Sequence, residues 1–273
     1  MESKKVLFVS QEVSPYVPDT PMSELGKALP SMVHGKKYEV RIFTPKYSCI
    51  NERRNQLHEV IRLSGLNLMI DDNDHPLIIK VATLLPSRMQ VYFIDNDDYF
   101  HPMAEKGLET DILAADNDKR MMFFTMGVIE TVKKLRWQPA IINCLGWISS
   151  LTPFYLRSSY ADDPTFRSTK IVYFLCPEGF AQPLDARFQE KLKLNGFTDE
   201  QISGLGTEPV TCETLVKFAI DNADAIVEAA EGVAPELLEY AKASGKPFLS
   251  LTDGAGKDEL FEFYNTLLDE EDE

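Results

Sequence analysis

The chain has 273 residues, of which 44% are hydrophobic and 26% are charged. This composition is typical of a folded globular protein and excludes a disordered chain, a collagen-like repeat and a disulfide scaffold. The net charge of −15 also argues against nucleic acid as a partner, because an acidic protein repels a phosphate polymer.

The first predicted unit consists of a strand, a helix and a second strand. Residues 6–9 form a continuous apolar run, which is typical of a strand buried on both faces of a parallel sheet. Thr20 and Pro21 are expected to begin a helix that ends at Gly35, and residues 39–43 have the pattern of the next strand.

The middle of the chain predicts an antiparallel hairpin. Residues 59–70 and 77–84 are extended, partly alternating stretches on either side of an acidic turn at 71–76. The turn carries three aspartates and His75, so a metal site is one interpretation, although solvated turns favour the same residue types. Residues 91–94 again have the pattern of a buried strand.

Helices and strands alternate again after Asp116, which we expect to cap a helix running to about Leu135. Strands are expected at 141–142, 171–175, 225–227 and 248–251. Helices are expected at 148–157, 185–222, 235–243 and 258–268, with looser turns around Gly196 and Gly204. Repeated units of this kind predict an α/β fold with a doubly wound, Rossmann-like, mainly parallel sheet and an inserted β-hairpin.

Acidic residues gather towards the C-terminal end. Residues 221–273 hold 15 acidic and three basic side chains, and the five residues 269–273 are all acidic. We predict one domain over residues 1–268 and a solvated acidic tail at 269–273. Docking of the tail to a basic partner is the alternative.

Cysteines and histidines are too dispersed for a zinc site. The four cysteines lie far apart without a C-x-x-C pair, and the four histidines are equally scattered. We therefore expect no metal and no cofactor, and the cysteine usage indicates a reducing compartment. No apolar run approaches the roughly 18 residues that span a bilayer, and the N-terminal run is too short for a signal peptide. These features predict a cytoplasmic protein without membrane contact.

The loop after the first strand is the expected ligand loop of such a sheet. Residues 10–25 contain no glycine. A loop that wraps a pyrophosphate needs glycines, because a Cβ would keep its N–H groups away from the phosphates. This loop is therefore a poor phosphate cradle.

Several motifs along residues 4–182 carry a family resemblance. The residues concerned are Lys5-Val6-Leu7-Phe8-Val9, Glu12-Val13, Pro15-Tyr16-Val17, Ala28-Leu29-Pro30, Glu39-Val40-Arg41, Thr44-Pro45-Lys46-Tyr47, Val91-Tyr92-Phe93, Asp95-Asn96, Tyr99-Phe100, Asp116-Asn117, Arg120, Pro139, Ile141-Ile142, Trp147, Pro153, Tyr155-Leu156 and Lys170. In these residues the chain resembles bacterial glycogen synthases and plant starch synthases, which begin K-V-L-F-V-x-x-E-V-x-P-[FY]-V-K-T-G-G-L-G-D and later carry P-D-I-I-H-x-H-D-W.

The resemblance implies one half of a two-domain GT-B glycosyltransferase that transfers glucose from a nucleotide sugar to a glucan end. The chain has about the length of the N-terminal, acceptor-side domain, and nothing in it corresponds to the donor-binding half. Because the chain closes with its own strand and helix, we expect a finished domain and not a truncated enzyme.

The departures from the family pattern fall where the resemblance places donor binding and catalysis. Pro18 stands in place of the donor-contacting lysine and Leu145 in place of a histidine, so neither position supplies a charge or a hydrogen bond. The substituted positions are Pro18, Thr20, Pro21, Glu24, Asn143, Leu145, Gly146, Cys176 and Pro177. Scaffold positions match while polar positions change, which is the pattern expected after loss of an activity.

The first functional hypothesis is a non-catalytic binding or regulatory domain related to glycogen metabolism. Its partner would be a protein or a glucan, with a nucleotide sugar disfavoured. The second is a glucosyltransferase that extends an α-1,4-glucan from ADP-glucose or UDP-glucose, either alone or with a partner chain that brings the donor domain. It would have to stabilise a leaving diphosphate, and the sequence offers neither the positive charge nor the glycine-rich N–H groups for that step.

The third hypothesis is a different enzyme in the same crevice, built from Glu12, Glu24, Cys176 and Glu178. Carboxylates raise the pKa of a thiol, so a buried and unreactive Cys176 is favoured over a nucleophile. Trp147 is expected in the core or the crevice wall, with stacking on a sugar as the alternative. The candidate crevice residues are Glu12, Tyr16, Glu24, Trp147, Cys176 and Glu178.

Overall fold

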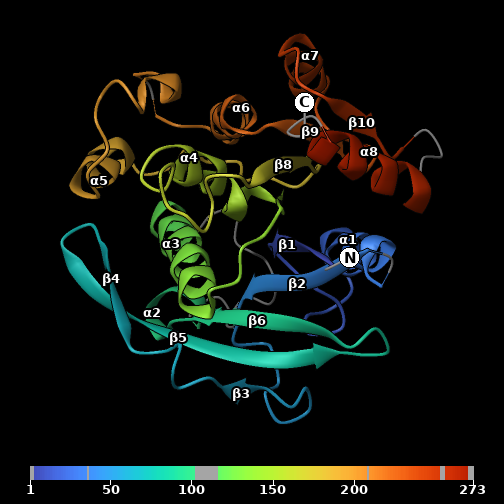
Figure 1. Cartoon of the computed structure of the whole chain (residues 1–273). Coiled ribbons are helices and arrows are strands. Elements are labelled where there is room, and N and C mark those ends of the chain that lie inside the picture. The colour runs from blue at the N-terminus through green and yellow to red at the C-terminus, as the bar shows by residue number, and fades with distance from the viewer. Residues whose placement is uncertain (1–2, 36, 102–115, 208, 253–255, 270–273) are drawn as a thin grey trace.

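The computed structural model describes residues 3–35, 37–101, 116–207, 209–252 and 256–269 (Figure 1). Strands of these residues form a mixed sheet in the order β10-β9-β8-β7-β1-β2-β6-β5-β3, with β4 paired to β5. The strands are β1 (Lys4–Ser10), β2 (Tyr38–Pro45), β3 (His58–Glu59), β4 (Leu66–Ile70), β5 (Asn73–Leu84), β6 (Met89–Asp95), β7 (Ile141–Leu145), β8 (Lys170–Leu175), β9 (Ala225–Glu228) and β10 (Phe248–Ser250).

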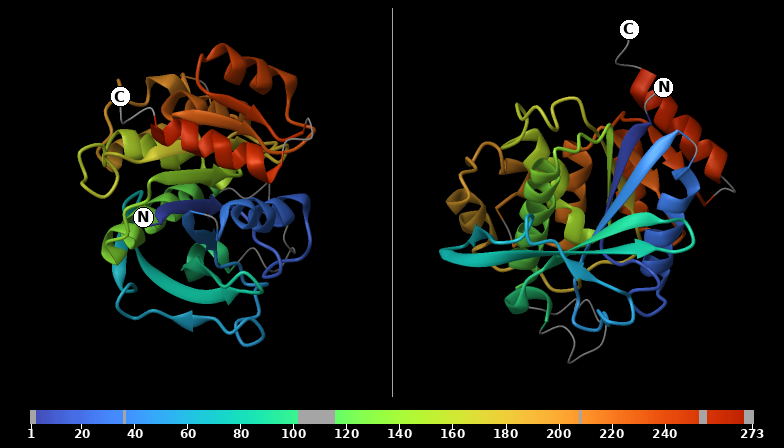
Figure 2. Two further views of the ribbon diagram at one scale, coloured as in Figure 1. Left: turned by 45° about the vertical axis from the view of Figure 1, so that its right-hand side comes forward. Right: turned by 60° about the horizontal axis from the view of Figure 1, so that its bottom comes forward.

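Helices cover both faces of this sheet. They are α1 (Pro21–Val33), α2 (Asp97–Phe100), α3 (Asn117–Leu135), α4 (Leu151–Arg157), α5 (Phe188–Leu194), α6 (Cys212–Asn222), α7 (Pro235–Ala243) and α8 (Lys257–Asp269), with 3₁₀ turns η2 (Trp147–Ser149) and η3 (Ser203–Leu205). Helices α3, α4 and α6 lie on one face, whereas α1 and α8 pack together on the other (Figure 2). The predicted doubly wound α/β fold is therefore confirmed.

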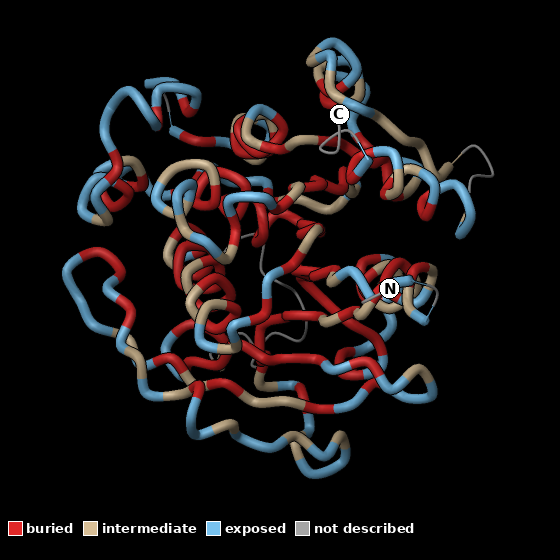
Figure 3. The backbone as a smooth tube through the Cα atoms, viewed as in Figure 1, coloured by how far each residue is buried: buried red, intermediate tan, exposed pale blue. Residues whose placement is uncertain are grey.

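The centre of the sheet is the apolar core of the molecule. Strands β10, β9, β8, β7, β1, β2 and β6 run parallel, and β1, β7 and β8 are buried along almost their whole length (Figure 3). Their continuous apolar runs reflect helices on both faces. The apolar stripe on α3, which includes Phe124 and Val128, is buried against this core as predicted.

The predicted hairpin is confirmed, but its turn is shorter than expected. Strands β4 and β5 pair antiparallel, with Ile70 opposite Asn73, so that only Asp71 and Asp72 form the turn. Asp71 has a φ of +60°, a backbone conformation that aspartate tolerates in tight turns. Residues 73–76, assigned to the turn from their polarity, belong to β5, because the ladder with β4 satisfies their backbone groups.

The long helical region expected at 185–222 is wrong in its middle. The structure has α5, a stretch of turns that contains η3, and then α6. Gly196 and Gly206 adopt φ values of +93° and +72°, which interrupt a helix, and Thr211 caps a new one by accepting a hydrogen bond from Thr214 N.

Two further expectations concern the ends of helices. Asp116 occupies the N-cap position of α3, yet its side chain makes no capping hydrogen bond. Helix α8 includes Asp269, so it continues one residue into the segment predicted as tail, while 270–273 lie outside the described residues. None of the described helices is both long and apolar enough to cross a membrane.

Candidate functional site

The carboxyl ends of β1 and β7 meet at the point where the chain changes direction in the sheet. The chain continues from β1 to β2 on one side and later returns to β7 on the other side. Ser10 and Leu145, the last residues of the two strands, lie opposite each other, and Gln11 N donates to Leu145 O at 3.1 Å. A crevice at such a switch point is where open α/β sheets bind ligands.

The loop that leaves β1 is held tightly against the start of α1. Ser10 Oγ donates to Glu12 O at 2.9 Å, and Ser14 N donates to Ser23 O at 3.0 Å. A Cβ on Gly26 would lie 2.0 Å from Glu12 O, so only glycine allows this approach of helix and loop. The loop is thus closed on the helix and does not form an open phosphate cradle.

Glu12 is the buried acidic group of this loop. Its side chain is 3% exposed and accepts a hydrogen bond from Thr20 Oγ1 at 2.5 Å. Burial raises the pKa of Glu12, and the nearby Glu178 carboxylate raises it further, while hydrogen bonds from Thr20 and Gln11 oppose the shift. Thr20 also forms a capping box with Ser23, which fixes the beginning of α1 and thereby the position of the loop.

The opposite wall follows strand β8. Glu178 Oε2 is buried and has no hydrogen-bond partner in the described part of the chain. Burial raises the pKa of the Cys176 thiol to about 12, with a further contribution from Glu178. Trp147 is 2% exposed and packs edge-on against Phe180, with ring centroids 5.4 Å apart. The structure therefore favours the inert thiol and the core position for the indole.

The family-motif positions on β7 have structural partners. Asn143 donates from Nδ2 to Leu7 O at 3.1 Å and accepts at Oδ1 from Tyr264 of α8 at 2.7 Å. Leu145 is fully buried. Gly146 has a φ of +81°, and a Cβ there would lie 2.7 Å from Gln11 Oε1, so both conformation and space require glycine.

Not every predicted crevice residue reaches the site. Glu24 lies exposed on the first turn of α1, without a recorded side-chain contact to Glu12, Cys176 or Glu178. Tyr16 is buried edge-on against Phe93, with a centroid distance of 4.9 Å. The positions that replace the family's lysine and one of its glycines, Pro18 and Pro21, are exposed, and so is Pro177. The predicted four-residue cluster is thus reduced to Glu12, Cys176 and Glu178.

Two residues of the site escaped the sequence reasoning. Gln11 is 2% exposed, and its Oε1 has no hydrogen-bond partner among the described residues. Tyr47, two residues after the neighbouring strand β2, donates from its hydroxyl to Gln11 O at 2.9 Å. The sequence offered one signal for them. Both residues closely follow a predicted buried strand, and residues in that position lie near the switch point of a parallel sheet.

The hairpin turn does not gather a metal site. Arg187 Nη2 pairs with Asp71 Oδ1 at 3.2 Å, whereas His75 contacts Asp98 at 3.1 Å and Tyr99 at 2.9 Å. The turn residues therefore point to separate partners.

A different group could hold a cation. Asp95, Asp97 and His101 each place one ligand atom within 4.8 Å of the others. Asp95 already pairs with Lys80 at 2.8 Å, so its charge is balanced by the protein itself.

Comparison with known proteins shows to which family the chain belongs. The family model described as Starch synthase catalytic domain matches residues 5–249. A glycogen synthase of Chlorobium luteolum is 32% identical over 238 residues, which cover 86% of this chain and 47% of the relative. A glycogen synthase of Pelodictyon phaeoclathratiforme is 39% identical over 174 residues, which cover 62% of this chain and 35% of the relative. The chain thus spans about half the length of these relatives or less.

A solved structure shares the fold. The catalytic domain of starch synthase IV from Arabidopsis thaliana, bound to ADP and acarbose, superimposes with a TM-score of 0.71 at 17% sequence identity. The match covers 92% of this chain and 51% of the plant protein chain. The likeness confirms a mostly parallel α/β sheet with an antiparallel insertion.

Proposed function

Because the chain belongs to the starch synthase catalytic domain family, we propose that it is a glycogen- or starch-synthase-like binding domain that does not itself transfer glucose. The proposal rests on the charge at the switch point, where Glu12 and Glu178 lie close enough to influence each other. A nucleotide sugar carries a diphosphate, and two carboxylates in a buried site oppose its approach.

The chemistry of glucose transfer also argues against catalysis by this site. A leaving diphosphate is stabilised by positive charge or by N–H groups aimed at it. Leu145 and Pro18 supply no charge at the positions where the family resemblance places polar groups, and Asn143 is engaged by Leu7 and Tyr264. These substitutions support binding without catalysis.

The remaining groups of the site suit a neutral, hydroxyl-rich ligand. Gln11 Oε1 and Glu178 Oε2 are buried acceptors without partners in the described residues, and a buried acceptor is stabilised by a hydrogen bond from a donor such as a sugar hydroxyl. We propose an α-glucan or a protein of glycogen metabolism as the partner.

The decisive experiment measures nucleotide binding, transfer and glucan binding on the same preparation. ADP-glucose and ADP are titrated calorimetrically, maltooligosaccharides are incubated with ADP-glucose, and mobility is compared in gels with and without glycogen. We expect no heat of nucleotide binding and no chain extension, with retardation by glycogen if the partner is a glucan.

The matched variant is Glu178→Gln, which keeps the shape of the side chain and removes its charge. If repulsion excludes the nucleotide, this variant gains weak ADP binding while the wild-type protein shows none. Micromolar ADP-glucose binding or glucan extension by the wild-type protein would refute the proposal. Extension only after addition of a second chain from the same cells would favour a transferase completed by a partner.

A further inference from the structure

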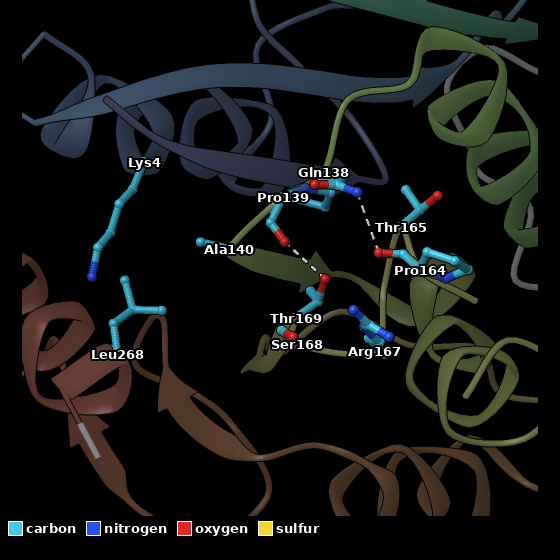
Figure 4. Close-up of a pocket in the computed structure, with 10 residues that line it drawn as sticks. All are labelled: Lys4, Gln138, Pro139, Ala140, Pro164, Thr165, Arg167, Ser168, Thr169 and Leu268. Atoms are coloured by element: carbon cyan, nitrogen blue, oxygen red, sulfur yellow. Dashed lines mark hydrogen bonds between the residues drawn. The ribbon is translucent and has the colours of Figure 1, made fainter. Parts of the chain in front are cut away.

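A cavity opens at the amino-terminal ends of the central strands, opposite the ends that carry Glu12 (Figure 4). It has a volume of about 490 Å³, which is within the size range of small-ligand sites. Lys4 begins β1, Ala140 immediately precedes β7, and Thr169 immediately precedes β8. The cavity therefore lies where three parallel strands start, away from the candidate site at their carboxyl ends.

The walls of the cavity are tied together by hydrogen bonds. Thr169 Oγ1 donates to Pro139 O at 2.7 Å, and Gln138 Nε2 donates to Pro164 O at 3.3 Å (Figure 4). Phe166, in the same loop, is 3% exposed and anchors that loop in the core. The cavity is thus preformed, and little ordering of the wall is required for a ligand to bind.

Two positively charged side chains line this cavity. Lys4 comes from the beginning of β1 and Arg167 from the loop before β8, and Figure 4 shows them on opposite sides of the opening. Both are exposed, and neither forms an ion pair with a carboxylate of the described residues. The exposed Ser168 adds a hydroxyl donor between them. The residues that line the cavity include these two cations and no carboxylate, whereas the whole protein has a net charge of −15.

We propose that this cavity binds the phosphate group of a small phosphorylated metabolite. The Arg167 guanidinium offers a planar pair of N–H donors that matches two phosphate oxygens, and the Lys4 ammonium on the other side of the cavity adds electrostatic attraction for the anion. The remaining volume takes the organic part of the ligand against Pro139 and Leu268. This inference is independent of the proposed function, because the two sites lie at opposite ends of the strands.

The test titrates the full chain with glycerol 3-phosphate by calorimetry at low ionic strength. Glycerol serves as the uncharged control, and malonate serves as an anion without phosphate. We expect saturable binding of glycerol 3-phosphate, no heat with glycerol and weaker binding of malonate. Lys4→Gln and Arg167→Gln should each weaken the binding about fivefold or more, since each removes a positive charge from the lining of the cavity.

The control variant is Arg53→Gln, which removes the same charge from an exposed residue outside the cavity. Its affinity for glycerol 3-phosphate should stay within about twofold of the wild-type value, because Arg53 does not line the cavity and makes no direct contact with a ligand bound there. If all three variants bound glycerol 3-phosphate equally weakly, the loss would come from the change in net charge, and the proposed site would be refuted. Absence of binding, or equal affinity for malonate, would overturn the assignment to phosphate.

Discussion

Glu12 is an acid whose surroundings disfavour its charge. Burial and Glu178 raise its pKa, so the folded chain holds the proton more tightly than the unfolded chain. The contribution of Glu12 to stability is therefore greatest below its unfolded pKa and decreases as the pH rises towards the folded pKa.

The change Glu12→Gln removes the energetic cost of burying a charged carboxylate near Glu178 and retains an acceptor for Thr20. We expect the free energy of unfolding at pH 7 to rise by about 1 kcal/mol, within the usual range for relief of such a cost. The gain should shrink as the pH falls towards 4, because wild-type Glu12 then becomes protonated. Urea denaturation at several pH values measures the difference. A gain independent of pH, or a loss at pH 7, would contradict the role given to burial.

Cys176 should be the poorer nucleophile of a matched pair of thiols. Its pKa of about 12 leaves almost no thiolate at pH 8, whereas Cys49 is exposed. Peptide mapping after a short iodoacetamide pulse should show slower labelling of Cys176 than of Cys49. Glu178→Gln should speed the labelling of Cys176, because the pKa falls when a neighbouring negative charge is removed. Faster labelling of Cys176 than of Cys49 in the wild-type protein would restore the third hypothesis.

At the scale of elements, Thr20 connects helix α1 to the candidate site. Its side chain accepts from Ser23 N and donates to Glu12, so one hydroxyl both caps the helix and positions the acid. Thr20→Ala should lower the free energy of unfolding by about 1–2 kcal/mol, the usual cost of losing such a cap. Thr20→Ser keeps the hydroxyl and should restore most of the loss. Thermal unfolding that separates the two variants by less than the experimental error would exclude this role.

Helix α5 is joined to α3 by a buried ion pair. Lys191 Nζ lies 2.6 Å from Asp118 Oδ2, and the two side chains are 1% and 0% exposed. Lys191→Met would leave Asp118 buried without its cation and should cost about 3–5 kcal/mol. The double variant Lys191→Met with Asp118→Leu should recover much of this cost.

The control for that cycle is Lys193→Met. Lys193 lies on the same helix, is 45% exposed and pairs with the exposed Asp199, so its removal should cost only about 0.5 kcal/mol. Chemical denaturation of the wild-type protein, the single variants Lys191→Met and Asp118→Leu, and the double variant gives the coupling energy. Additive losses in the double variant would show that Lys191 acts through packing alone.

Local signals explain which elements the sequence could predict. Thr20 before Pro21 is a strong helix start, and the structure has the helix there, with the hydroxyl in place. Aspartate is an equally suitable N-cap residue, yet the backbone of Asp116 has a ψ of 21° and its side chain makes no hydrogen bond to the helix N–H groups. Cap chemistry can therefore be read from residue type, but only when the backbone of the cap is extended.

For the whole molecule, the buried strands determined the fold prediction. Continuous apolar runs at β1, β7 and β8 predicted a parallel sheet, and such a sheet places its ligand crevice at the switch point. The partners inside the crevice could not be predicted in this way. Tyr264 reaches Asn143 across 121 residues of sequence, and the closeness of Glu12 to Glu178 depends on two loops whose conformations no periodicity describes.

The acidic end of the chain follows a residue that lines the cavity at the start of the strands, so its charge is expected to affect anion binding there. Leu268 lines that cavity, and residues 270–273, which follow Asp269, carry four carboxylates. A chain that ends at Asp269 should bind glycerol 3-phosphate about twofold to threefold more tightly at low salt, since four negative charges that follow the cavity-lining Leu268 in the sequence are removed. The gain should disappear near 0.5 M salt, where the Debye length falls to about 4 Å. Calorimetry at the two salt concentrations tests this. Equal affinity of both chains at low salt would mean that the acidic end is electrostatically separate from the cavity, and a gain that persists at high salt would mean direct competition between them.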